Sequence, residues 1–124
     1  MANPEAEGVL RIARRDLRMT AKLLDPDVEE GSWGWAVQQA FEKTLKAWLH
    51  QLGVRPPHSQ DIARLLVLLE QAGVDVSELL PLRAFTTFAV QGRYDDEPEE
   101  LGLDRFAWSQ RAEALIDHVQ KLLR

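Results

Sequence analysis

One regular stripe of large apolar residues, between positions 32 and 53, constrains the fold of this chain most strongly. Its members are separated by steps of four, four, three and four residues: Val37, Phe41, Leu45, Trp48 and Leu52. This spacing places all five side chains on one face of an α-helix. We expect Ser32 to cap the start of this helix, and Gly53 with Pro56-Pro57 to end it.

Four further segments carry helical signals, whereas no segment shows the period-two alternation of a strand. Asn3-Pro4-Glu5 is typical of a helix start, and Asp25-Pro26 stops that helix. The other expected helices run from Ser59 or Gln60 to Gly73, from Glu78 to about Gln91 behind a Ser77 cap, and from Asp104 almost to Arg124. Residues 93–103 are acidic and predict a solvated loop.

Each expected helix has an apolar face. The residues expected to be buried are Leu10, Ala13, Leu17, Ala21 and Leu24; Ile62, Leu65, Leu66 and Leu69; Leu80, Ala84, Phe85 and Phe88; and Trp108, Ala112, Leu115, Val119 and Leu122. Short connections make neighbouring helices antiparallel, so the sequence predicts an all-α, five-helix antiparallel up-and-down bundle. Trp33, Trp35 and Leu49 lie off the main stripe, which places the second helix at the centre or against a second subunit.

Composition narrows the class of protein. The 124 residues suit one domain spanning 1–124, and 45% apolar with 28% charged residues is ordinary for a globular chain. A net charge of −5 argues against a surface built as a whole to wrap a polyanion. Without cysteine there is no disulfide framework, thiolate zinc site or cysteine nucleophile. The acidic N-terminus and the short apolar runs favour a cytoplasmic protein without a membrane span.

Basic residues gather on one side of the first helix: Arg11, Arg14, Arg15, Arg18 and Lys22. They could steer RNA or a nucleotide, with Arg93 and Tyr94 adding phosphate contact and base stacking. The alternative is a solvated helix face, because Asp16 interrupts the run. Three His residues in separate segments predict no metal site, and we expect no cofactor.

The second helix also carries a family pattern. Residues 38–49 read Gln-Gln-Ala-Phe-Glu-Lys-Thr-Leu-Lys-Ala-Trp-Leu, followed by a short proline-containing loop, His58 and a leucine-rich segment. This resembles the HEPN domain, whose second helix commonly reads Gln-x-x-Glu-Lys-x-Leu-Lys-Ala. Ala13-Arg14-Arg15-Asp16-Leu17 matches the start of the family, and Arg93-Tyr94-Asp95 resembles its Arg-Tyr-Pro-Asp motif without the proline.

The resemblance implies a helical bundle that dimerises. It also implies frequent association with a small nucleotidyltransferase encoded beside it, often as a toxin–antitoxin pair. Many family members are metal-independent ribonucleases that use an Arg-x4-6-His motif near the dimer interface, and others lack the motif. The surplus of large apolar residues, notably Trp33, Trp35, Trp48 and Trp108, separately favours a homodimer.

Arg111 and His118 fit the upper limit of the ribonuclease spacing. Seven steps are nearly two helical turns, so the two side chains share a face about 10 Å apart along the axis. His118 could exchange a proton with the 2′-hydroxyl or the leaving oxygen, and Arg111 could hold the scissile phosphate. The structural alternative is a boundary or interface role, since Ala112 replaces the usual small polar residue.

The second-helix signature includes Glu42, Lys43 and Lys46. Lys43 or Lys46 could therefore contact a phosphate or a partner; a solvated helix face is the alternative.

Three interpretations of the function follow. The first is a non-catalytic HEPN subunit that binds a nucleotide or pairs with a nucleotidyltransferase. The second is a HEPN endoribonuclease, and the third is a helical scaffold dimer. We favour the first, with no catalytic activity of the chain on its own.

Overall fold

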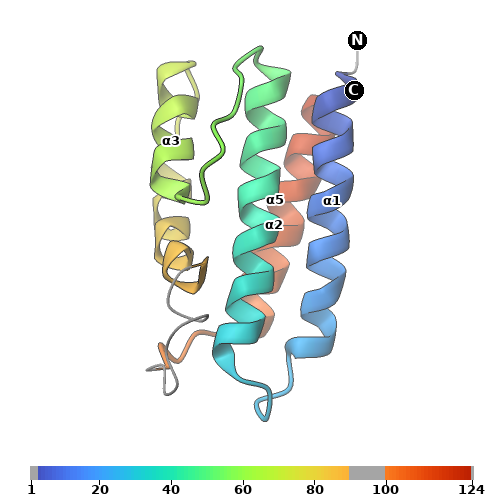
Figure 1. The fold of residues 1–124 in the computed structure, drawn as a ribbon, viewed down its shortest axis with the longest axis vertical. Helices are drawn as coiled ribbons and strands as arrows, with labels where there is room; N and C mark the ends of the chain where they lie inside the picture. Colours follow the sequence, from blue (N-terminus) through green and yellow to red (C-terminus); the bar gives the residue numbers. More distant parts are fainter. Residues whose placement is uncertain (1–2, 90–99, 124) are drawn as a thin grey trace.

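The computed structural model describes residues 3–89 and 100–123, and every regular element in that part is helical. The elements are α1 (Pro4–Thr20), η1 (Ala21–Leu23), α2 (Glu30–Gln51), α3 (Ile62–Gln71), η2 (Ser77–Phe85) and α5 (Arg105–Leu122). Figure 1 shows them packed side by side along one axis, with α2 between α1 and α3. The helical bundle expected from the sequence is confirmed.

The path of the chain explains the directions of the helices. α1 and η2 run one way, while α2, α3 and α5 run the other (Figure 1). The 52–61 segment returns along α2 without forming a helix, and the Gln38 side chain donates a 2.9 Å hydrogen bond to the Gln60 carbonyl. α3 therefore runs parallel to α2, because the chain returns along α2 as an extended segment and not as a helix.

α2 is the central helix, which is one of the two alternatives that the sequence allowed. Its stripe is buried from Val37 to Trp48, and Trp33 and Leu49 are fully buried off that stripe. Leu52 is exposed, because the helix ends at Gln51 and Gly53 takes the left-handed conformation with φ 77°.

The first turn of α2 differs from the sequence prediction. The helix begins at Glu30, and Ser32 is an exposed residue inside it rather than its cap. The buried Glu30 carboxylate accepts hydrogen bonds from the backbone N–H groups of Leu101, at 2.6 Å, and Leu103, at 3.0 Å. Contacts from a distant segment therefore fix this end of α2 instead of a local cap.

Arg105, in the first turn of α5, binds the connection between α1 and α2. Its guanidinium donates to the carbonyls of Leu23, Asp25 and Val28 at 2.7–2.9 Å. The start of α5 is thus bound to the connection between α1 and α2.

The Asn3 and Asp104 caps are confirmed: Asn3 accepts from the N–H groups of Glu5 and Ala6, and Asp104 accepts from the N–H group of Ala107. α3 starts at Ile62, two or three residues later than expected, capped by Asp61.

The expected α-helix over 78–91 is wrong for most of its length. Residues 77–85 form a 3₁₀-helix, followed by an α-helical turn over 86–89; residues 90 and 91 lie outside the described part. Leu82, Phe85 and Phe88 are buried, whereas the expected Leu80 and Ala84 are exposed. The reason is the three-residue period of the 3₁₀-helix, which brings 82 and 85 onto one side; Phe88 is buried in the α-helical turn that follows.

An aromatic cluster holds η2 against α2 and α5. The Phe85 ring centroid lies 5.8 Å from Trp33, 5.3 Å from Phe41 and 4.9 Å from Trp108, all edge-to-face. Phe88 packs on Gly34, where an added Cβ would approach its ring to 2.6 Å. Only glycine therefore fits at this crossing.

The last and first helices bury slightly different residues from those expected. In α5, Ala112 and Val119 are buried as predicted, Trp108 and Leu115 are half-buried, and Ile116 and Leu123 replace the exposed Leu122. In the first helix, Leu10 and Ala13 are buried, but Ala21 is exposed because the α-helix tightens to η1 after Thr20. Among the described residues, no helix is long and apolar enough to cross a membrane.

Candidate functional site

The predicted pair Arg111 and His118 lies along one open groove between α5 and η2, which we call the α5–η2 groove. It encloses about 560 Å³, and its walls include Trp48 of α2 and the 75–79 segment at the start of η2. Both predicted side chains are exposed and line it. The structure therefore brings the pair to one surface, as the seven-residue spacing predicted.

Arg111 is held in place by two contacts. Its Nη2 donates to the Glu78 carbonyl oxygen at 2.8 Å, and its guanidinium carbon lies 4.8 Å from the Trp108 ring centroid. A guanidinium over an indole face gains cation–π attraction in addition to the hydrogen bond. Arg111 therefore connects α5 to η2.

His118 contacts an aromatic ring. Its ring centroid lies 5.3 Å from that of Trp48, in an edge-to-face arrangement. Two turns of α5 separate it from Arg111, about 10 Å along the axis. One phosphate can therefore contact both groups of a single chain only if both side chains extend towards it.

The rim of this groove carries a negative charge. Asp75 accepts from the Ser77 hydroxyl at 2.6 Å and from the Ser77 backbone N–H at 3.0 Å. The side-chain hydrogen bond, helped by the backbone one, lowers the pKa of Asp75, so it is a carboxylate at neutral pH. A carboxylate beside the groove disfavours an approaching phosphate.

The second-helix signature forms a different kind of site, which we call the Glu42 cluster (Gln39, Glu42, Lys43 and Lys46). Glu42 is only 2% exposed, and its two oxygens accept from Lys43 Nζ at 2.6 Å and Lys46 Nζ at 3.1 Å. Lys43 also donates to Gln39 at 3.2 Å. This is not the exposed ion pair expected from the sequence, because the carboxylate is buried against neighbouring helices.

Sequence reasoning missed two members of this network, Gln38 and Gln39. Gln39 donates to Gln38 at 2.7 Å, and Gln38 continues to the Gln60 carbonyl. The signal was present, since Gln39 and Lys43 are four residues apart. The network connects the ammonium groups of α2 to the segment that precedes α3.

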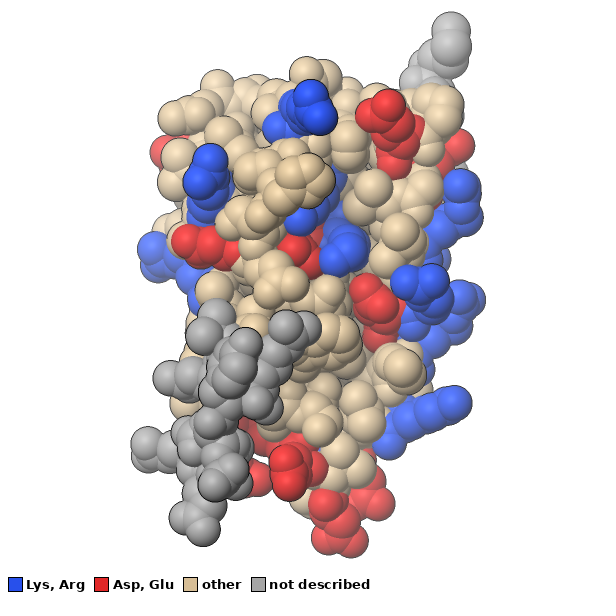
Figure 2. All heavy atoms as spheres, in the orientation of Figure 1, with Lys and Arg blue, Asp and Glu red and all other residues tan. Residues whose placement is uncertain are grey.

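Asp16 of α1 lies beside the same cluster. Burial raises its pKa, while the charges of Lys43 and Arg15 act in the opposite direction and Glu42 reinforces the rise. Asp16 therefore faces α2 rather than the outer basic side of α1. Figure 2 shows Lys and Arg side chains along the edge of the molecule formed by α1.

The remaining predicted residues contribute less. Arg93 and Tyr94 lie outside the described residues. His50 Nδ1 lies 3.2 Å from a Glu5 carboxylate oxygen, a contact across α1 and α2. Within residues 3–89 and 100–123, no group of three His, Asp or Glu side chains has the arrangement of a metal site.

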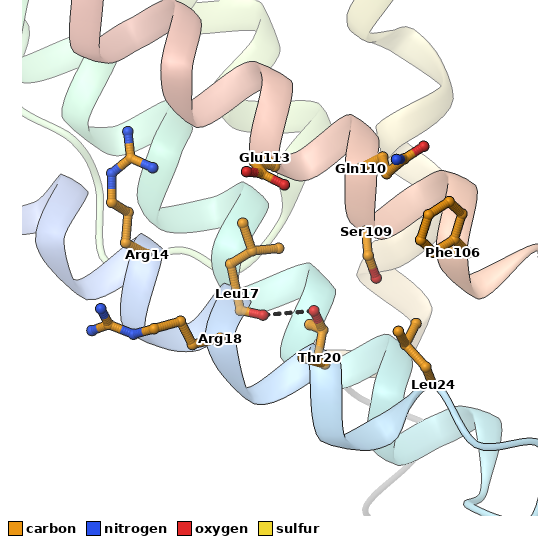
Figure 3. Close-up of a pocket in the computed structure, with 10 residues that line it drawn as sticks. Arg14, Leu17, Arg18, Thr20, Leu24, Phe106, Ser109, Gln110 and Glu113 are labelled. Carbon is orange, nitrogen blue, oxygen red and sulfur yellow. Dashed lines mark hydrogen bonds between the residues drawn. The ribbon is translucent and has the colours of Figure 1, made fainter.

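A third surface feature is a groove of about 430 Å³ between α1 and α5 (Figure 3). Arg14 and Arg18 line it from α1, and Glu113 and Phe106 line it from α5.

The expectation of a dimer partly depended on Trp33 and Trp48, and both are buried within the single chain. Any contact between copies must therefore use other apolar residues.

The comparisons with known proteins identify one family. The HEPN domain model matches residues 6–124, which is nearly the whole chain. A search of curated proteins and a search of solved structures found no match.

Proposed function

Since this chain belongs to the HEPN domain family, we propose that it is a non-catalytic member that binds a nucleotide or pairs with a small nucleotidyltransferase. The resemblance supports a partner of this kind, because such chains are frequently encoded beside such an enzyme, often as a toxin–antitoxin pair. The geometry of Arg111 and His118 supports the absence of catalysis by the chain alone.

One observation carries the non-catalytic part of the proposal. Arg111, the residue that would hold the scissile phosphate, already donates to the Glu78 carbonyl and lies on the Trp108 ring. The hydrogen bond to η2 and the ring contact hold the guanidinium in place, so a phosphate could use only its remaining N–H donors. A catalytic group must also be within about 3.5 Å of the reacting atoms, whereas the His118 ring, two turns away on the same helix, packs against Trp48.

Lys43 and Lys46 remain our predicted contacts for the partner or nucleotide, together with Arg93 and Tyr94. The side chains of Lys43 and Lys46 are 25% and 17% exposed, so each ammonium is partly open to solvent while bound to Glu42. A phosphate or carboxylate of the partner can therefore reach them without breaking the Glu42 cluster.

Two measurements test this function. The purified chain should not cleave single-stranded RNA, with or without EDTA. It should co-purify with the nucleotidyltransferase encoded beside its gene when only the latter carries an affinity tag. Lys43→Ala with Lys46→Ala should weaken this co-purification, whereas the exposed Arg64→Ala on α3 serves as the matched control. Absence of any complex would contradict the pairing.

A ribonuclease is the second candidate, because Arg111 and His118 line the same groove. Metal-independent RNA cleavage that disappears in His118→Ala, with an unchanged circular dichroism spectrum, would favour this function and contradict the first. Arg111→Ala should then lose cleavage too. Under the function proposed above, both substitutions leave partner binding largely intact.

A further inference from the structure

The groove in Figure 3, which we call the α1–α5 groove, has a charged end and an apolar end. Arg14, Arg18 and Glu113 lie at its charged end. Leu24 and Phe106 lie at its apolar end. Its volume of about 430 Å³ is within the range of small-molecule sites, about 300–1,000 Å³. The groove is therefore large enough for a small ligand that is charged at one end and apolar at the other.

One ion pair fixes the levels of the two walls. Arg14 Nη2 lies 2.9 Å from Asp117 Oδ1, so these residues are level with each other. Because α1 and α5 run in opposite directions (Figure 1), four residues along α1 correspond to four residues back along α5. Arg18 on one wall is therefore level with Glu113 on the other.

Arg18 and Glu113 are opposite charges that do not pair with each other. Both residues are exposed, and neither side chain belongs to an ion pair within the described part of the chain. Figure 3 shows the Leu17 side chain pointing from α1 towards α5, between the two walls. A free cation and a free anion at one level match a ligand head group that carries both charges.

We propose that the α1–α5 groove binds the zwitterion of a free aromatic α-amino acid. The ligand carboxylate would accept from the Arg18 guanidinium, which can donate two parallel hydrogen bonds to it. The ligand ammonium would donate to the Glu113 carboxylate. The ligand ring would then extend along the groove towards Phe106.

Phe106 favours an aromatic side chain on the ligand. Its ring is 62% exposed, more than any other large apolar side chain among the described residues. Seven residues separate it from Glu113, about 10 Å along α5, and an aromatic amino acid spans this distance together with the two protein side chains. Contacts between aromatic rings stabilise beyond the area that they bury, so an aliphatic ligand would gain less.

The charges argue against two other kinds of ligand. A nucleotide would bring its phosphates towards Glu113 and Asp117 as well as towards the arginines. A fatty acid carries only a carboxylate, which the Glu113 charge would repel. A zwitterion matches both charges of the groove, and this is the observation that selects it.

The proposal is independent of the proposed function. The α1–α5 groove shares none of its described lining residues with the α5–η2 groove or the Glu42 cluster. A ligand in it leaves both of those sites open. The inference therefore adds a binding site and does not change the assignment of the other two.

The core supplies a reporter for this groove. Trp33 Nε1 donates to the Ser109 hydroxyl oxygen at 3.2 Å, and Ser109 lines the groove. Heteronuclear NMR of the isotope-labelled chain should therefore show a saturable shift of the Trp33 indole N–H resonance when phenylalanine is added into the millimolar range. The indole resonance of Trp48, which lines the α5–η2 groove, should stay in place. Leucine should bind at least about threefold more weakly than phenylalanine.

Matched variants test the two charged contacts. Arg18→Gln and Glu113→Gln should each weaken phenylalanine binding about two- to fivefold, as expected for exposed charged contacts. Arg64→Gln and Glu70→Gln, at exposed positions of α3, should bind phenylalanine like the native chain. Circular dichroism checks that all four variants keep the native helical content.

Two ligand analogues assign each charge to its partner. At about pH 6, where an α-amino group is charged, N-acetylphenylalanine lacks the ammonium and phenylalaninamide lacks the carboxylate. Loss of the ammonium should weaken binding to the native chain but not to Glu113→Gln, because that contact is already absent. Loss of the carboxylate should behave in the same way with Arg18→Gln.

Four results would each overturn the proposal. They are an unshifted Trp33 resonance at millimolar phenylalanine, unchanged binding by the Arg18 and Glu113 variants, analogues that bind as tightly as phenylalanine, and adenosine monophosphate that binds more tightly than phenylalanine. The last result would show that the groove takes a nucleotide.

Discussion

The Glu42 cluster and the α5–η2 groove both contain charged residues that the sequence singled out, yet they differ in burial. Glu42 is almost completely buried and binds two lysines, whereas Arg111 and His118 are exposed along an open groove. In the Glu42 cluster the charges are part of the packing between helices. In the α5–η2 groove the charged side chains lie at the surface of the molecule.

This difference indicates what each site contributes. Removing one member of a buried charged network leaves partners that were desolvated for it, which costs stability. Removing an exposed side chain costs little, because water replaces its contacts. We therefore expect the Glu42 cluster to maintain the fold and the α5–η2 groove to be nearly neutral for stability.

The largest effect should come from the hydrophobic core around α2. Phe41 is buried on α2 and contacts both Phe85 and Trp108 edge-to-face. Phe41→Ala should lower the free energy of unfolding by about 3–5 kcal/mol, because it leaves a cavity in the aromatic cluster. Urea denaturation followed by circular dichroism measures this, and an unchanged midpoint would show that α2 is not the central core helix.

Glu42→Ala should have the next largest effect, about 2 kcal/mol. The cost should stay below that of breaking a fully buried pair, because Lys43 and Lys46 are partly exposed and can reach water. Glu42→Gln keeps the shape and should cost less than Ala. If Glu42→Ala costs no more than an exposed glutamate such as Glu70→Ala, the cluster is not structural.

Arg111→Ala and His118→Ala should each change stability by less than about 1 kcal/mol. Arg111 loses one hydrogen bond to a carbonyl and an exposed cation–π contact, and His118 loses one ring contact. Thermal unfolding of the two variants beside Glu42→Ala compares the sites directly. A loss for Arg111→Ala as large as that for Glu42→Ala would remove the distinction between them.

The fold was predictable wherever local signals decided the structure. The apolar period of α2 and the caps Asn3, Asp104 and Gly53 depend on neighbours in sequence, and the structure has them where expected. The 3₁₀ conformation of η2 was not predictable in this way. Leu80-Ala84-Phe88 and Leu82-Phe85-Phe88 are both present in the sequence, and packing against Trp33, Phe41 and Trp108 selects the second.

The same distinction applies to the candidate sites: local spacing was predictable, and contacts between distant segments were not. The spacing of Arg111 and His118 predicted their common surface, because one helix carries both. The bond from Arg111 to the Glu78 carbonyl joins residues 33 positions apart and requires the tertiary structure. The burial of Glu42 was also hidden, since an exposed i,i+4 pair and a buried one have the same spacing.

The smallest effect concerns Asp16, at the edge of the Glu42 cluster. Burial raises its pKa above the ordinary 3.8, so the protonated form is favoured on folding. The stability that the protonated Asp16 contributes is therefore lost as the pH rises from the unfolded-state pKa through the folded-state pKa.

Asp16→Asn removes the charge and should stabilise the chain at pH 7, by no more than about 0.5 kcal/mol. The difference from the native chain should vanish below pH 3.8, where Asp16 is protonated in both states. Thermal unfolding at pH 7 and at about pH 3 measures both differences, with the exposed Asp27→Asn as the control of equal charge. If Asp16→Asn is less stable than the native chain at pH 7, the attraction of Lys43 outweighs burial, and Asp16 belongs to the Glu42 cluster as a stabilising member.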